Sequence, residues 1–290
     1  MPWQHQVQAP AKEDRIYEVS VAGKRVVCAL KHSISETSRR DDRRRIRLEL
    51  VDFMLGFLHQ ARLYSRALEL NRSLPPQSPP VEGGGLIPLL WREGLGVRTA
   101  RTGTDGPNST CGSSEEESHD EGRLSQVRLS HDALGRPFLF VGSKRGPSVS
   151  FSYSHGVVWG ALCEEGPRCG IDSARGDEFA PGYPFDRAFN EEEFAQAITT
   201  VSSDCCDAAA ALWSAKEAVV KAIGCGFNLI DPLEVTIRFT SVFPYEFEGH
   251  GVVNEQALSR VPLRGAVFPV RTFRYAQDWV SVAVAPLSDG

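Results

Sequence analysis

Apolar and polar residues alternate over residues 16–29, on either side of Gly23 and Lys24. A period of two places the apolar side chains on one face of a β-strand, and a central glycine is typical of a tight turn. This stretch is therefore predicted to form a β-hairpin. The same alternation covers residues 149–153, and an apolar run over residues 157–163 is its expected partner strand.

Helices are predicted where apolar residues recur at three- and four-residue spacing. One such stripe runs over residues 38–69 and carries several arginines in its first turns. A second covers residues 207–223 and ends before Gly224, which suits a left-handed helix stop. A shorter helix should begin at Asn190, because Glu193 stands at the third position of a capping box.

Two further alternating runs, over residues 233–239 and 279–285, predict half-buried strands. Each half of the chain thus offers strands and one long helix, so the fold class is predicted to be α+β. Residues 73–126 are rich in proline, glycine and serine and contain an acidic run, and we expect a flexible insertion there. We expect an N-terminal subdomain over residues 1–160, including this insertion, and a C-terminal subdomain over residues 161–290.

The composition narrows the class of protein. The 290 residues carry a formal charge of −5 and a sequence pI near 5.9, which argues against a strongly basic nucleic-acid-binding protein. No apolar stretch is long enough to span a membrane, and the N-terminus lacks the pattern of a secretory signal. The seven cysteines form no Cys-x-x-Cys, which fits neither a disulfide framework nor a zinc site. We therefore expect a soluble cytoplasmic protein with no membrane or nucleic-acid partner.

Candidate chemistry is concentrated in residues 213–221, Trp-Ser-Ala-Lys-Glu-Ala-Val-Val-Lys. On a helix, Trp213, Glu217 and Lys221 lie at four-residue steps on a face separate from the apolar stripe. A carboxylate and an ammonium therefore point the same way. From spacing alone, an ordinary exposed ion pair, worth a few tenths of a kcal/mol, is the simpler interpretation.

A second carboxylate bears on the choice between an ordinary ion pair and a functional site. A short apolar strand ends in Asp172, where an acidic residue usually caps a strand or forms a turn. Together with Glu217, however, Asp172 could supply the one or two carboxylates by which Mg²⁺ is held while a substrate phosphate fills other positions. Lys216 and Lys221 would then face the same phosphates. His155 would add a donor, although a lone histidine at a turn is more often structural.

In order and spacing these residues resemble the 4′-phosphopantetheinyl transferases, specifically the long, monomeric, pseudo-dimeric type that includes the surfactin-synthetase-activating enzymes. The family pattern is Ser-His, then Gly-(Ile/Val)-Asp, then Trp-Ser-x-Lys-Glu-x-x-x-Lys. These motifs stand here at residues 154–155, 170–172 and 213–221. Gly-Arg-Pro at residues 135–137 and Gly-Cys-Gly at residues 224–226 also match. The resemblance is firm from about residue 135 to residue 239.

The resemblance implies a fold of two similar α/β subdomains related by a pseudo-twofold, with coenzyme A in the cleft between them. It also implies transfer of the 4′-phosphopantetheine arm of coenzyme A to a serine of an acyl or peptidyl carrier protein, in polyketide or nonribosomal peptide biosynthesis. The apo carrier becomes the holo form and adenosine 3′,5′-bisphosphate is released. Such a holo-[acyl-carrier-protein] synthase is expected to need Mg²⁺ and to act as a monomer.

The resemblance also assigns roles to residues. Asp172 and Glu217 are expected to hold Mg²⁺, and Glu217 is also a candidate to take the proton of the carrier serine. Lys221 is expected to neutralise developing charge, so the catalytic set is Glu217, Lys221 and Asp172. Ser154 and His155 are assigned to the 3′-phosphate of coenzyme A. The full set expected to bind coenzyme A is Ser154, His155, Arg136, Lys216, Lys221, Arg40 and Arg44.

One position departs from the family pattern. Many members read Gly-x-Asp-x-Glu, with the second acid also on the metal, whereas this chain has Ala174. A water could replace that carboxylate, because Mg²⁺ readily keeps several waters. Asp177 or Glu178 could compensate if the following loop folds back. The departure bears on metal affinity more than on the class of reaction.

Two alternatives use the same residues. A non-catalytic module that binds coenzyme A or a carrier protein would keep the fold, but such a module has no physical need for a carboxylate pair suited to a metal. A magnesium-dependent hydrolase of nucleotide pyrophosphates would use the same metal site. That hydrolase would turn over coenzyme A without any carrier protein.

Overall fold

The computed structural model describes residues 15–32, 40–73, 127–163, 167–180, 182–243, 245–261 and 265–286. The chain divides into two compact units, one made of residues 1–60 and 122–290 and the other of residues 61–121. Every described element belongs to the first unit, except for the end of one helix. The insertion predicted over residues 73–126 lies outside the described residues, apart from Ser73 at the end of that helix.

The described elements follow the chain in mixed order. Those up to residue 163 are β1 (Arg15–Val21), β2 (Lys24–His32), α1 (Arg40–Ser73), β3 (Val127–His131), β4 (Pro137–Val141), β5 (Lys144–Arg145), β6 (Ser148–Ser154) and β7 (Val157–Cys163). The remaining strands are β8 (Cys169–Arg175), β9 (Val235–Phe243), β10 (Glu246–Val253), β11 (Val267–Tyr275) and β12 (Asp278–Val284). The remaining α-helices are α3 (Glu191–Thr200), α4 (Cys205–Ile223) and α5 (Glu255–Leu258). The short 3₁₀ helices are η1 (Gly176–Phe179), η2 (Phe185–Arg187), η3 (Gly226–Asn228) and η4 (Pro232–Glu234).

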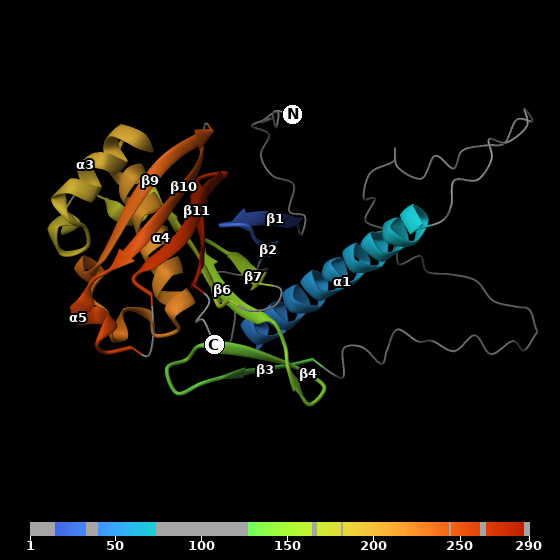
Figure 1. Cartoon of the computed structure of the whole chain (residues 1–290). Coiled ribbons are helices and arrows are strands. Elements are labelled where there is room, and N and C mark those ends of the chain that lie inside the picture. Colours follow the sequence, from blue (N-terminus) through green and yellow to red (C-terminus); the bar gives the residue numbers. More distant parts are fainter. Residues whose placement is uncertain are drawn as a thin grey trace, which may run out of the picture. The chain divides into compact units, whose positions relative to one another are not determined.

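Two antiparallel sheets make up most of the first unit (Figure 1). The first sheet has the strand order β1-β2-β7-β6, and the second has the order β8-β12-β11-β10-β9. A small third sheet consists of β3, β4 and β5. β6 and β8 are edge strands of different sheets, and they lie side by side. The functional residues gather where these two edges meet.

The two sheets and two of the helices form layers, and successive residues of one strand face different layers. On β2, Val27 packs in a cluster with Met54 of α1, whereas the next residue, Cys28, packs in a cluster with Val280 of the second sheet. The other face of the second sheet, which carries Trp279, packs against α4. The order of layers is therefore α1, first sheet, second sheet, α4. β2 and β12 are buried on both faces in this arrangement, whereas Arg238 and Thr240 of β9 are exposed on the face away from α4.

The predicted hairpins and helices are confirmed, and so are the predicted strands, except that the strand expected to end in Asp172 continues to Arg175. β1 and β2 are joined by Ala22 and Gly23, which both have positive φ as a type I′ turn requires. The backbone N–H of Asn190 donates to Oε1 of Glu193 at 2.8 Å, one half of the capping box at the start of α3. α4 ends at Gly224, whose φ of 97° is left-handed. The mixture of sheets and helices confirms the α+β class.

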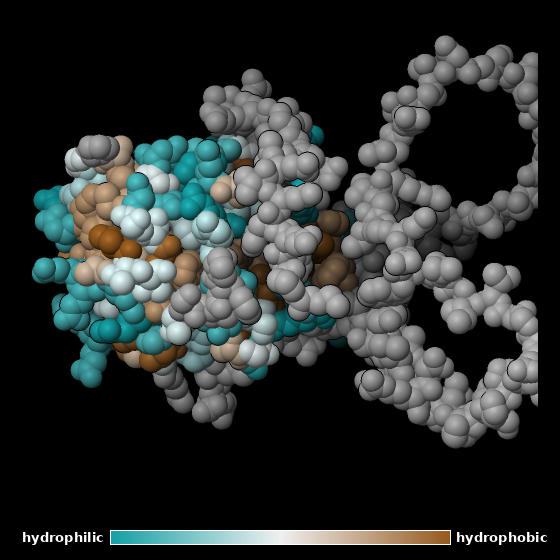
Figure 2. Space-filling view, turned by 90° about the horizontal axis from the view of Figure 1, so that it is seen from above, coloured by the Kyte–Doolittle hydropathy of each residue, from teal (hydrophilic) through white to brown (hydrophobic). Residues whose placement is uncertain are grey.

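The described surface carries both polar and apolar side chains. Its exposed large apolar side chains are Phe53, Leu134, Val141, Leu229, Leu233, Tyr245 and Val267. On the face drawn in Figure 2, hydrophobic residues reach the surface in limited areas flanked by hydrophilic ones. Over the described ranges, no helix combines the length and the apolar character needed to cross a bilayer.

Candidate functional site

Serine hydroxyls join β6 to β8 where the two sheets meet. Alternate serines of β6 point toward β8 and accept hydrogen bonds from its backbone. The bonds run from Cys169 N to Ser148 Oγ (3.0 Å), from Ile171 N to Ser150 Oγ (3.1 Å) and from Ser173 N to Ser152 Oγ (3.2 Å). Because the donors of an edge strand need partners when buried, this row fixes β8 beside β6. We call these three bonds the serine seam.

Asp172 lies on β8, within the seam and facing α4. Ser152 donates a hydrogen bond to its Oδ1 at 2.8 Å, and Nζ of Lys221 lies 2.5 Å from the same oxygen. Gly170 permits this contact, because a Cβ at that position would lie 2.0 Å from the carbonyl oxygen of Ala218 on α4. Only glycine lets α4 approach β8 closely enough to set its lysine against the carboxylate.

Glu217 completes a group of three charges. Its Oε2 lies 3.7 Å from Nζ of Lys221, so the one ammonium contacts both carboxylates. Burial raises the pKa of Glu217, the negative charge of Asp172 raises it further, and Lys221 opposes both effects. Two carboxylates and one ammonium leave an excess of negative charge that a bound cation would offset.

These residues fit the magnesium ion that the motifs imply. Asp172 and Glu217 offer carboxylate oxygens, which are the ligands Mg²⁺ prefers, and both contacts of Asp172 use Oδ1. In the part of the chain that the structure describes, no group of three or more His, Cys, Asp or Glu side chains has the spacing of a metal site. Two protein carboxylates suffice for Mg²⁺, because it keeps several waters. Ala174, at the family's third position, is buried in the core that includes α4.

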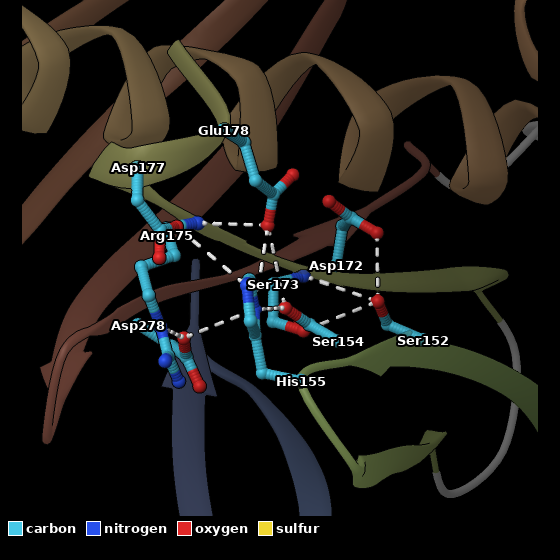
Figure 3. A network of polar contacts seen from close by, with 9 residues as sticks. All are labelled: Ser152, Ser154, His155, Asp172, Ser173, Arg175, Asp177, Glu178 and Asp278. Atoms are coloured by element: carbon cyan, nitrogen blue, oxygen red, sulfur yellow. Dashed lines mark hydrogen bonds and ion pairs between the residues drawn. The ribbon is translucent and has the colours of Figure 1, made fainter. Parts of the chain in front are cut away.

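His155 occupies the turn between β6 and β7 (Figure 3). It and Gly156 both have positive φ, at 46° and 75°, which gives the two-residue loop a type I′ geometry. A positive φ is uncommon outside glycine, so the backbone at His155 carries some strain. Its Nδ1 lies 2.8 Å from Ser154 Oγ, and its Nε2 lies 3.5 Å from Oδ1 of Asp177.

Glu178, on η1, faces the same turn (Figure 3). Its Oε1 accepts the backbone N–H of Arg175 at 3.2 Å and lies 3.5 Å from Ser154 Oγ and 3.6 Å from His155 Nδ1. Burial raises the pKa of Glu178, the Arg175 N–H and the His155 ring oppose that shift, and the charge of Asp172 adds to it. The loop after β8 therefore does fold back, and it brings Glu178 to the Ser154-His155 turn and within electrostatic reach of Asp172.

Lys216 lies apart from these residues, in the core between α4 and the start of α3. Its Nζ lies 2.5 Å from Oε1 of Glu193 and donates to the carbonyl oxygens of Ala188 at 2.9 Å and Pro232 at 2.8 Å. The side chain is fully buried, and burial lowers its pKa while Glu193 opposes the shift. This geometry makes Lys216 a structural residue, in contrast to the phosphate contact that the motif suggested.

The predicted arginines differ in placement. Arg136 lies at the C-terminal end of α4, one turn beyond Lys221, where a Cβ on Gly224 would lie 2.8 Å from its Cδ. Its Nε pairs with Oδ2 of Asp132 at 3.2 Å. Arg44 is exposed on α1. Arg40 is the first residue of α1, and its side chain lies outside the described residues.

Two other arginines of the same run on α1 contact aromatic rings, which the sequence alone did not predict. Cζ of Arg43 lies 4.7 Å from the ring centroid of Tyr153, and Cζ of Arg47 lies 5.4 Å from that of Phe151. Both rings belong to β6, and Tyr153 immediately precedes Ser154. The available signal was spacing: arginines four residues apart share a helix face, and rings two residues apart share a strand face.

Comparison with known proteins agrees with this geometry. A family model described as the 4′-phosphopantetheinyl transferase superfamily matches residues 168–261. The matched segment runs from the start of β8 to just beyond α5 and contains Asp172, Glu217 and Lys221. A search of curated proteins found no match. The resemblance predicted from the motifs is thus confirmed over the matched segment, residues 168–261.

Proposed function

We propose that this protein transfers the 4′-phosphopantetheine arm of coenzyme A to a serine of an acyl or peptidyl carrier protein. The serine oxygen forms a bond to the phosphorus that carries the pantetheine arm, and the bond from that phosphorus to the leaving adenosine 3′,5′-bisphosphate breaks. The proposal includes dependence on Mg²⁺, a monomeric state, and two subdomains that divide near residue 160 and are related by a pseudo-twofold. It also includes service to polyketide or nonribosomal peptide synthesis in the cytoplasm.

One observation carries the proposal. Asp172, Glu217 and Lys221, which are up to 49 positions apart in the chain, converge in one cluster inside the segment that matches the superfamily. Phosphoryl transfer needs positioning and neutralisation of charge more than covalent chemistry from the protein. A cluster of two oxygen-ligand carboxylates and a lysine supplies both. An ordinary surface ion pair would need neither the second carboxylate nor the close approach at Gly170.

The family resemblance suggests a role for each residue. Asp172 and Glu217 would hold Mg²⁺, which when bound neutralises charge on the pyrophosphate. The raised pKa of Glu217 makes it a better base than an exposed glutamate, so it is placed to take the proton of the carrier serine. Lys221 offsets charge that develops on the leaving phosphate. Ser154 and His155 bind a phosphate of coenzyme A, and Arg136 lies near its adenine nucleotide.

The test is mass spectrometry of an apo carrier protein incubated with this protein, coenzyme A and Mg²⁺. We expect the carrier to gain one phosphopantetheine, and we expect the gain to vanish with chelator and with Glu217→Gln. Glu191→Gln is the matched control, because Glu191 is an exposed carboxylate in the first turn of α3. That variant should transfer at the wild-type rate.

The same assay separates the alternatives. Adenosine 3′,5′-bisphosphate released without a carrier would point to a pyrophosphate hydrolase. Tight binding of coenzyme A with no transfer to any of several carriers would point to a binding module. Either result would contradict the transferase function.

A further inference from the structure

The serine seam does not continue to the next serine of β6, Ser154. In the first three positions, a serine hydroxyl of β6 accepts the N–H of the residue 21 positions later on β8. Continuing that register would pair Ser154 with the backbone N–H of Arg175. The structure instead has Oε1 of Glu178 there, 3.2 Å from Arg175 N and 3.5 Å from Ser154 Oγ. A carboxylate oxygen thus lies between the Arg175 N–H and Ser154, where the seam would otherwise form a direct hydrogen bond.

Three polar groups lie around that one oxygen, two of which, Ser154 Oγ and His155 Nδ1, also bond each other at 2.8 Å. They are the backbone N–H of Arg175, the hydroxyl of Ser154 and Nδ1 of His155, the last at 3.6 Å (Figure 3). Only the first distance is that of a good hydrogen bond, and the other two are long. Convergent donors of this kind form an anion site. Here the anion comes from the chain itself and is loosely held.

We propose that the Glu178 carboxylate occupies the place of a substrate phosphate oxygen and must leave it before the substrate binds. The identity of the substrate rests on the proposed function, in which Ser154 and His155 bind a phosphate of coenzyme A. Glu178 then sets the affinity for the nucleotide, because only the fraction of molecules with the site vacated can bind. If Glu178 fills the site about nine-tenths of the time, its removal raises the affinity about tenfold.

Two other roles of Glu178 make different predictions. As the residue that bonds the Arg175 N–H, it caps η1, and its loss would lower stability without raising affinity for a phosphate. As a replacement for the acid missing at Ala174, it would hold Mg²⁺, and its loss would weaken metal binding. The distances favour the anion site, because Oε1 accepts the Arg175 N–H and lies within 3.6 Å of two polar groups of the Ser154-His155 turn.

The test is calorimetric titration of the full chain with adenosine 3′,5′-bisphosphate, and separately with inorganic phosphate, in the presence of chelator. Glu178→Ala should lower the dissociation constant of the bisphosphate about tenfold. Glu178→Gln keeps an acceptor for the Arg175 N–H and should give a smaller gain. The matched control is Asp186→Ala, which removes the same charge from an exposed position on η2 and leaves the contacts of Glu178 in place; it should change the dissociation constant less than threefold.

A double variant makes the test specific to the site. In a Ser154→Ala background, Glu178→Ala should lose most of its gain, because the vacated donor is absent. Equal gains from Asp186→Ala and Glu178→Ala would mean that the effect comes from general charge, and would overturn the proposal. Unchanged or weaker bisphosphate binding by Glu178→Ala and Glu178→Gln, both still folded by thermal melting, would also overturn it. Because these titrations need no carrier and no turnover, a gain in affinity without transferase activity would uphold the anion site while rejecting the proposed function.

Discussion

Asp172 is a buried carboxylate that interacts with several other residues of the candidate site. It accepts from Ser152 across the junction of the two sheets and from Lys221 on α4, and its charge raises the pKa values of Glu217 and Glu178. A buried carboxylate normally has a strong cost unless it is paired and hydrogen-bonded. Asp172 meets both conditions. The negative charge of Glu217 is offset less fully, because the ammonium of Lys221 lies closer to Asp172. The local excess of negative charge is therefore concentrated on the residue proposed as the base.

Replacing Glu217 by glutamine should separate activity from stability. Transfer should fall at least about 100-fold, because the amide cannot take the proton and holds a cation more weakly than a carboxylate does. A carboxyl whose pKa is raised by folding stabilises the fold at low pH and loses that contribution as the pH rises through the raised pKa. At pH 7 the anion is thus a net cost, and the thermal midpoint of Glu217→Gln should equal or exceed that of the wild type. Initial transfer rates and thermal melts check this, and a clearly lower midpoint would contradict it.

At the scale of elements, helix α4 carries two lysines with different roles. Lys221 faces β8, whereas Lys216 faces Glu193 of α3. Five residues of an α-helix turn through about 500°, so the two side chains point about 140° apart. The motif Trp-Ser-x-Lys-Glu-x-x-x-Lys therefore spans both a buried structural face and the face that carries the site.

Lys216→Met should behave as a folding variant. It leaves the Glu193 carboxylate in the core without its cation, and breaking a buried pair in this way costs about 3–5 kcal/mol. Urea unfolding should show that loss, while the folded fraction keeps the wild-type KM for coenzyme A. A normally stable variant with a raised KM would restore Lys216 to the phosphate site. Lys144→Met, at an exposed position on β5, is the control and should change the unfolding free energy by less than about 0.5 kcal/mol.

Periodicity and turn chemistry predicted the hairpins, the start of α3 and the end of α4, since these depend on local preferences. Spacing also placed Glu217 and Lys221 on one face of α4. The approach of Asp172 to them came from family resemblance, because it depends on the pairing of β8 with β12 and on the contact at Gly170. Lys216 was misplaced because its partner, Glu193, is 23 positions away and was expected only to cap a helix. The role of Glu178 could not be predicted, because it depends on the register of two strands that share no backbone ladder.

The serine seam predicts that loss of one of its serines lowers the free energy of unfolding. Ser150→Ala removes the acceptor of the Ile171 N–H in a buried position, which should cost about 1–3 kcal/mol. Amide hydrogen exchange at Ile171 should speed up by more than at amides of β11. Ser20→Ala, on the exposed side of β1, should cost less than about 0.5 kcal/mol. An unchanged unfolding free energy for Ser150→Ala would show that the seam adds nothing to stability.

At the scale of the whole first unit, an aromatic cluster joins the two sheets. Tyr17 of β1 and Trp159 of β7 contact Phe273 and Tyr275 of β11, with ring centroids 5.2–6.3 Å apart. Such contacts add to the stabilisation that burial provides. The cluster borders the site, because Asp278, which pairs with Arg175, lies directly opposite Tyr275 on β12. Adjacent residues therefore connect the junction between the sheets to the start of the loop that carries Glu178.

This cluster predicts a specific sensitivity to alkali. Burial and the neighbouring Tyr275 raise the pKa of Tyr17 to about 12, from an ordinary value of 10. A group with a raised pKa contributes stability fully below its unfolded pKa and loses it as the pH rises through the folded value. The wild type should therefore lose stability between about pH 10 and 12 relative to Tyr17→Phe, whose ring keeps the packing without the ionisable hydroxyl. Urea unfolding of both proteins from pH 8 to pH 11.5 isolates this effect, because all other titrating groups are common to the two. A difference in unfolding free energy that stays constant over this range would mean that Tyr17 is not buried at the junction in solution.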